Sequence, residues 1–117
     1  MTPDECVALL RDIVQTRAVD SILSAIEKPP GRRPKPELVE TSASYAKLSI
    51  QDRERLRIVA SLVARQAVFG VLAVLDGARV IDDGREKGTF KLSYRKGGEE
   101  WDLNLADGVP LHDLLAE

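Results

Sequence analysis

Apolar and polar positions along the chain organise around one stretch, Ser49 to Asp76. It opens as a charged amphipathic segment and is apolar on every side from Ala67 onward. Ser49 followed three residues later by Asp52 is a helix N-cap pattern, and Gly77 is a plausible C′ residue in the left-handed conformation. The pattern predicts one long central helix over residues 49–76. A helix that is apolar all round must be buried, either by its own domain or by a second copy.

The buried face of this helix is predicted to begin with five apolar residues at helical spacing: Ile50, Leu56, Val59, Leu62 and Val63. Gly70 lies further along, where a glycine costs about 1 kcal/mol relative to alanine. We interpret it as a point of close approach by another backbone, with a chance glycine as the alternative. The candidate homodimer interface is therefore Val68, Phe69, Gly70, Val71 and Leu72.

The chain begins with a second clear helix signal. Thr2 and Glu5 are spaced as a capping box, with Pro3 at the first helical position. Apolar residues then recur at helical spacing from Cys6 to Val14, and the pattern resumes at Val19 in a different phase.

The change of phase near Thr16 has two interpretations. The helix is kinked there, or two helices follow one another with Thr16 or Asp20 as the second N-cap. The sequence leaves both open.

A proline-rich linker is predicted at residues 28–40, because four prolines and a glycine lie between Lys28 and Glu37. Its basic residues Arg32, Arg33 and Lys35 are either a recognition arm or, as we favour, part of a solvated connection. A short helix over residues 41–48 is expected to direct Tyr45 and Leu48 toward the core.

Residues 89–95 and 99–105 alternate between apolar and polar side chains around Gly97-Gly98, which predicts an antiparallel hairpin. The expected register places Lys96 opposite Glu99 and Tyr94 opposite Trp101, and extends to Phe90 opposite Leu105. This register gathers the large apolar residues on one face, which we expect to pack on the central helix.

Three acidic residues lie on the hairpin: Glu99, Glu100 and Asp102. They are either a carboxylate cluster for acid–base or cation chemistry or, as we favour, cross-strand partners on the solvent-facing side. Together with Asp82 and Asp83 they are the acidic groups that an immunity-type protein would use against a basic partner. Residues 78–81 are expected to form a short edge strand, and residues 111–115 a short helix. His112 and Asp113 are neighbours in that helix, and we interpret His112 as an exposed surface histidine.

Taken together, the elements predict a mainly helical α+β fold in a single domain spanning residues 1–117. The net charge of −2 gives no field that would attract a polyanion, so a nucleic-acid partner is not expected. Cys6 and His112 are the only cysteine and histidine, which excludes an intramolecular disulfide and a zinc set built from these residues. The acidic N-terminal residues are unlike a signal peptide, and Arg65 interrupts the apolar stretch, so we expect a soluble cytoplasmic protein without a membrane partner.

The sequence contains no nucleotide-binding, nucleophile-elbow or metalloprotease motif, and it predicts no catalytic residue, metal or cofactor. Cys6 is expected to be a small buried hydrophobe rather than a reactive thiol. The segment from Phe69 to Arg79 resembles the core of a small, uncharacterised bacterial single-domain family. That resemblance implies a bacterial cytoplasmic protein and adds no catalytic residue.

The leading functional prediction is a non-enzymatic protein–protein interaction module, either a homodimer or a toxin-neutralising immunity-type protein that uses its acidic groups. The alternative is a ligand-binding protein or enzyme with a pocket between hairpin and helices, lined by Phe69, Tyr94 and Trp101. Asp76 and Arg79 are the only ionisable residues of the segment from Phe69 to Arg79, and we expect that they could pair at the helix end. They join Tyr94 and Trp101 as candidate partner or pocket residues.

Overall fold

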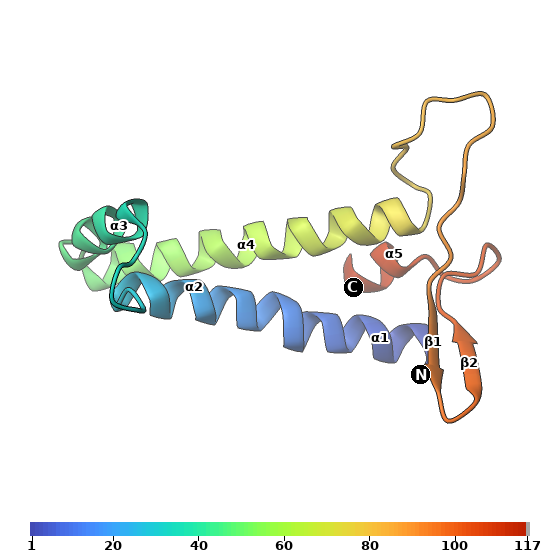
Figure 1. The fold of residues 1–117 in the computed structure, drawn as a ribbon, viewed down its shortest axis with the longest axis horizontal. Coiled ribbons are helices and arrows are strands. Elements are labelled where there is room, and N and C mark those ends of the chain that lie inside the picture. The colour runs from blue at the N-terminus through green and yellow to red at the C-terminus, as the bar shows by residue number, and fades with distance from the viewer. Residues whose placement is uncertain (117) are drawn as a thin grey trace.

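The computed structural model describes residues 1–116 and shows a mainly helical α+β fold, with a long central helix and an antiparallel hairpin on its C-terminal side (Figure 1). The predicted fold class is confirmed. The elements in chain order are α1 (Pro3–Leu9), the π-helix η1 (Leu10–Thr16), α2 (Arg17–Glu27), α3 (Pro36–Ala46), α4 (Ile50–Leu75), β1 (Ser93–Lys96), β2 (Glu99–Asp102) and α5 (Leu111–Ala116).

α1, η1 and α2 follow one another without interruption as one rod, and the change of phase near Thr16 falls at the end of the π-helix. The Thr16 side chain makes no cap hydrogen bond, so Thr16 is not the N-cap of a separate second helix. Thr2 and Glu5 make the predicted capping box at the start of α1. A π-helix has more residues per turn than an α-helix, which accounts for the change of helical phase between α1 and α2. The Thr16 hydroxyl donates to the carbonyl of Arg11, five residues earlier, at 3.0 Å.

α3 begins at Pro36, so the predicted linker 28–40 is too long and ends at Lys35. Proline lacks the N–H that the first helical position does not need, so Pro36 starts a helix instead of prolonging the loop. Tyr45 is buried as predicted, whereas Leu48 is exposed. Arg53 of α4 lies over the Tyr45 ring at 5.0 Å, which fixes α3 against the start of α4.

α4 has the predicted extent and ends. The Ser49 hydroxyl accepts from the Asp52 N–H at 3.1 Å. At the other end, Gly77 has φ +77°, and the N–H groups of Gly77 and Ala78 donate to the carbonyls of Val74 and Ala73. This is a complete Schellman motif, in which glycine supplies the left-handed residue at low cost.

The hairpin has the predicted register but shorter strands. Tyr94 pairs with Trp101 and Lys96 with Glu99, and both turn glycines have positive φ. The strands stop at Ser93 and Asp102, although the Leu103 N–H still donates to the Leu92 carbonyl at 2.9 Å. Phe90 and Leu105 are therefore outside the ladder and half exposed, contrary to the predicted apolar face.

The hairpin reaches the helices at its base. Leu103 is buried, and Leu92 packs against a small core of Val7, Leu72, Leu111 and Leu115. The segment at residues 77–92 is a long loop without helix or strand, so the edge strand predicted at residues 78–81 is absent from the described chain.

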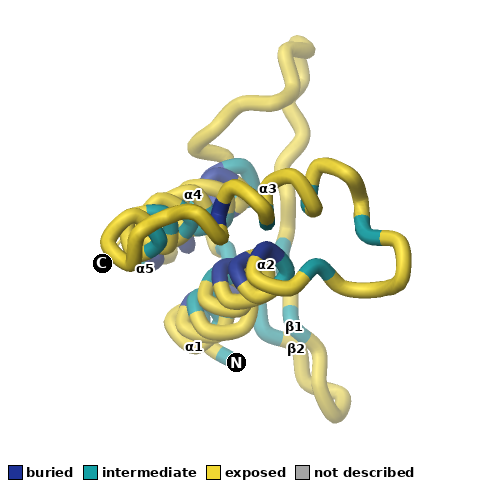
Figure 2. The backbone as a smooth tube through the Cα atoms, turned by 90° about the vertical axis from the view of Figure 1, so that its left-hand side faces the viewer, coloured by how far each residue is buried: buried dark blue, intermediate teal, exposed yellow. Residues whose placement is uncertain are grey.

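The molecule is open and elongated, with a radius of gyration of 18.4 Å and extents of 51 × 38 × 30 Å. A compact chain of this length would have a radius of gyration of about 13 Å. Figure 2 shows that exposed positions cover most of both long rods. The rod α1–η1–α2 and α4 form a single layer, whereas domains normally bury their apolar faces between two packed layers.

Candidate functional site

An unburied apolar surface lies on α4, on the side turned away from α2. Leu56, Ala60 and Ala64 are half buried and mark the inner face. Because successive helical residues are rotated by about 100°, Leu62 points nearly opposite to Ala60 and Ala64.

Three residues on that side form the outer apolar face of α4: Val59, Leu62 and Val63, which are 53%, 57% and 62% exposed. The predicted buried face was therefore wrong within this chain, where Leu56 alone of its five members is half buried and Ile50 is fully in solvent. The sequence shows that α4 is apolar on both sides. It does not indicate which of the two sides the rest of the chain covers.

The first rod also leaves apolar side chains uncovered. About half of each of the following residues is exposed: Leu9, Ile13, Val14 and Ile22. The same rod buries Val7, Val19 and Leu23, so it too has apolar groups on more than one side. A helix that is apolar beyond its buried face is typical of a surface that another element covers.

The exposed area of the chain is 8953 Å². A compact monomer of 12.9 kDa would expose about 6,300 Å². The excess of about 2,600 Å² reflects the open arrangement of the whole chain, in which most residues of the loop at residues 77–92 and of the two rods are exposed. Obligate dimers bury roughly 1,000–2,500 Å² per partner, so the excess is of the size that a stable dimer requires.

The candidate interface predicted at residues 68–72 is mostly occupied by its own chain. Leu72 belongs to the core, and Val68 and Phe69 pack against that core. Val71 remains exposed.

Gly70 is buried beneath the side chain of Arg79, and a Cβ built on Gly70 would lie 2.9 Å from Arg79 Nη1. The close neighbour of Gly70 is thus a guanidinium of the same chain rather than a second backbone. Gly70 therefore gives no support to a dimer interface. The exposed residues of the outer apolar face of α4 are the better candidate for that interface.

α4 is also long and apolar enough, by length and composition, to cross a membrane. Only 17% of its most apolar window is buried. The core helix of a soluble protein can pass the same test, so this finding is weak evidence for a span. Arg65, within that stretch, donates to the Ala116 carbonyl at 3.1 Å and ties α4 to the last helix.

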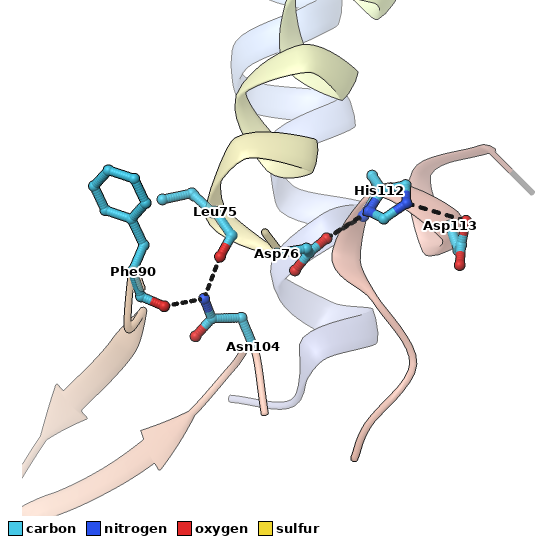
Figure 3. A network of polar contacts seen from close by, with 6 residues as sticks. All are labelled: Leu75, Asp76, Phe90, Asn104, His112 and Asp113. Carbon is cyan, nitrogen blue, oxygen red and sulfur yellow. Dashed lines mark hydrogen bonds and ion pairs between the residues drawn. The ribbon is translucent and has the colours of Figure 1, made fainter. Parts of the chain in front are cut away.

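The most buried polar contact joins the end of α4 to α5 (Figure 3). Asp76 Oδ2 accepts from the backbone N–H of His112 at 2.9 Å and lies 2.8 Å from His112 Nδ1. The side chains of Asp76 and His112 are only 4% and 15% exposed, so the predicted surface histidine is wrong. The expected pairing of Asp76 with Arg79 is not among the ion pairs of the described chain.

This contact also explains an acidic residue at the C-terminal end of α4, where the helix dipole opposes it. Asp76 accepts from an N–H in the first turn of α5, where a carboxylate is favourable. The second ring nitrogen of His112 lies 3.4 Å from Asp113, and Phe69 packs edge-on at 5.4 Å. Both polar partners of the ring in residues 1–116 are carboxylates, so the geometry holds α5 in place and presents no nucleophile for catalysis.

Asn104 is a second polar anchor, between α4, the loop and the hairpin. Its Nδ2 donates to the carbonyls of Leu75 at 2.9 Å and Phe90 at 3.0 Å, and its Oδ1 accepts from the Leu92 N–H at 2.7 Å. One side chain thereby replaces the ladder where the strands stop (Figure 3). Sequence reasoning missed Asn104, because its alternation with apolar neighbours is typical of a solvent-facing strand residue.

The expected pocket lined by Phe69, Tyr94 and Trp101 is not assembled. Tyr94 and Trp101 contact each other on the hairpin, with ring centroids 5.8 Å apart, whereas Phe69 packs on His112. A cavity of about 520 Å³ lies elsewhere, between the end of α4, the loop at residues 77–92 and the chain after β2.

The acidic residues of the hairpin are opposed by basic residues. Arg95 lies 3.5 Å from Glu100, and Lys91 lies 3.3 Å from Asp102. The Lys91–Asp102 contact is an ion pair without hydrogen-bond geometry. Residues 1–116 contain no group of three potential metal ligands.

Two ionisable groups are perturbed. Hydrogen bonds from the N–H groups of Gly84 and Gly88 lower the pKa of the exposed Asp82 carboxyl. Burial raises the pKa of the Cys6 thiol, which favours the unreactive protonated form.

Comparison with protein-family models, with curated proteins and with solved structures finds no match. The resemblance of the segment from Phe69 to Arg79 to a bacterial family therefore stays a prediction. We therefore infer the function from the geometry of this chain.

Proposed function

We propose that this protein is a non-enzymatic interaction module that works as a homodimer, held together by the outer apolar face of α4 and the exposed apolar residues of α1–η1–α2. The observation that carries this proposal is the outer apolar face of α4, where Val59, Leu62 and Val63 are 53%, 57% and 62% exposed. Packing this face on the same face of a second copy covers the apolar side chains that the chain itself leaves exposed.

A second copy is the occupant that this geometry supports best. Two copies of α4 that pack through their outer apolar faces bury these faces against each other, as amphipathic helices commonly do. A symmetric dimer uses the same patch on both chains, so it needs no complementary partner surface. Val59 and Leu62 would lie near its centre.

Size-exclusion chromatography with light scattering tests the proposal directly. We expect a mass twice the 12.9 kDa of the chain at micromolar concentrations. A mass of one chain at every concentration would overturn the dimer. Recovery of the protein only in detergent, or its co-sedimentation with phosphatidylcholine vesicles, would instead assign the outer face of α4 to a membrane.

A further inference from the structure

The cavity of about 520 Å³ beside the end of α4 has the size of a small-molecule site, for which volumes of roughly 300–1,000 Å³ are typical. Its apolar wall consists of Val74, Leu75, Val80, Ile81, Phe90 and Leu105. Val80, Ile81, Phe90 and Leu105 are at least half exposed, so the chain leaves this wall unfilled.

The cavity continues along α4 into a second hollow of about 380 Å³, which shares Val74, Leu75 and Arg79 with it. Arg79 therefore stands at the junction of the two spaces, with its guanidinium lying over Gly70. The missing side chain of Gly70 is what gives the guanidinium room to lie there.

Three carboxylates and three cations line the cavity, so its formal charge is balanced, but the cations differ in whether they have a partner. Both oxygens of Asp82 accept backbone N–H groups of its own loop, and Asp102 lies beside Lys91. Within residues 1–116, Arg79 and Lys87 have no carboxylate partner.

Asp76 also lines the cavity, but its carboxylate is bonded to His112. The guanidinium of Arg79 is therefore a cationic group at the cavity without an ion-pair partner in residues 1–116, and its complement is an anion.

The wall of the cavity belongs to a loop whose ends are fixed. Residues 77–92 are longer than most structureless connections, and such loops are commonly functional. Asn104 bonds the carbonyls of Leu75 and Phe90 and so holds the two ends of the loop near each other. The opening is thus set by hydrogen bonds to rigid elements.

We propose that this cavity binds a small amphipathic carboxylate, with its alkyl chain against the apolar wall and its carboxylate on Arg79. The apolar wall supplies affinity through buried area, and the single unpaired guanidinium selects a carboxylate over a neutral head group. Lys87 adds a second, weaker attraction at the rim.

Isothermal titration of the full chain with decanoate, below its micelle concentration, tests this site, with decanol as the neutral match. We expect decanoate to bind and decanol to bind at least about tenfold more weakly, because a charge-assisted hydrogen bond is lost. The variant Arg79→Gln should lose a similar factor for decanoate, whereas Lys96→Gln at the hairpin tip, the matched control, should bind as the wild type does. No decanoate binding at millimolar concentration, or equal binding by the wild type and Arg79→Gln, would overturn the proposal.

Amide chemical-shift mapping on the wild type keeps the test independent of how Arg79→Gln folds. Shifts on adding decanoate should concentrate at Val80, Ile81 and Phe90. Shifts concentrated at Val59 and Leu62 would instead show the ligand on the outer apolar face and refute the cavity assignment. The mass measured by light scattering is a separate readout, so failure of this site and failure of the dimer are distinguishable.

Discussion

The substitution Leu62→Glu is the sharpest test of the proposed dimer, because it changes the centre of the outer apolar face and little else. Leu62 is 57% exposed, so the chain itself gains only part of the burial energy of this side chain. Complete burial of a leucine side chain is worth about 1.5–3 kcal/mol, which leaves about 1–1.5 kcal/mol for a partner to supply. A symmetric interface contains the position twice, so the apolar contribution to dimerisation is about 2–3 kcal/mol.

This contribution corresponds to a factor of about 30–150 in the dissociation constant, and burial of two carboxylates adds to it. We therefore expect Leu62→Glu to weaken the dimer by about 100-fold or more. Sedimentation equilibrium over a wide range of protein concentrations measures the constant. Circular dichroism should show unchanged helicity, since the position is exposed within the chain.

Val109→Glu is the matched control, because Val109 is 59% exposed and lies in the chain before α5, outside the helices of both rods. Its dissociation constant should equal that of the wild type. Equal constants for wild type and Leu62→Glu would refute the reasoning. Equal weakening by both variants would show a general effect of charge rather than an interface at Leu62.

Three further predictions concern the polar side chains Asn104, Asp76 and Asp82. Asn104→Ala leaves backbone groups at the hairpin base unpaired and should lower the free energy of unfolding by about 1–3 kcal/mol, measured by urea denaturation; an unchanged value would show that water replaces the side chain. Asp76→Asn should cost a similar amount in the same assay, whereas Asp113→Asn, at an exposed carboxylate, should be nearly neutral, and equal effects would contradict the role of the buried contact. Because the pKa of Asp82 is lowered, its contribution to stability is present above the ordinary carboxyl pKa and is lost as pH falls through the lowered value. Asp82→Asn should therefore reduce the loss of stability on acidification. An identical dependence of stability on pH for the variant and the wild type would contradict this.

Local signals in the sequence were sufficient for the ends of α4 and the register of the hairpin. Ser49 and Gly77 act through backbone geometry within a few residues, and two consecutive glycines define a tight turn that fixes Tyr94 opposite Trp101. These features depend on neighbours in sequence, so a single sequence contains them.

The site residues depend on partners far along the chain, which is why they were missed. His112 is largely covered because its backbone N–H donates to Asp76, 36 residues earlier, and its Nδ1 lies 2.8 Å from the same carboxylate. The covered side of α4 was misassigned for a related reason, because apolar residues surround the helix and give no indication of which side α2 occupies. The ends of β1 and β2 were overestimated since Asn104 replaces the ladder beyond Leu103.

The π-helix η1 sets the rotation of α2 relative to α1 about the axis of the rod. Deletion of one residue would change this rotation, whereas a substitution would not. The extra residue between Leu10 and Thr16 sets the angle between the side of α1 that holds Val7 and the side of α2 that holds Leu23. Removing one residue would restore an ordinary α-helix, yet it would turn α2 by about 100° about its own axis. The chain would then have a regular α-helix, but the sides that hold Val7 and Leu23 would no longer keep their present orientation relative to each other.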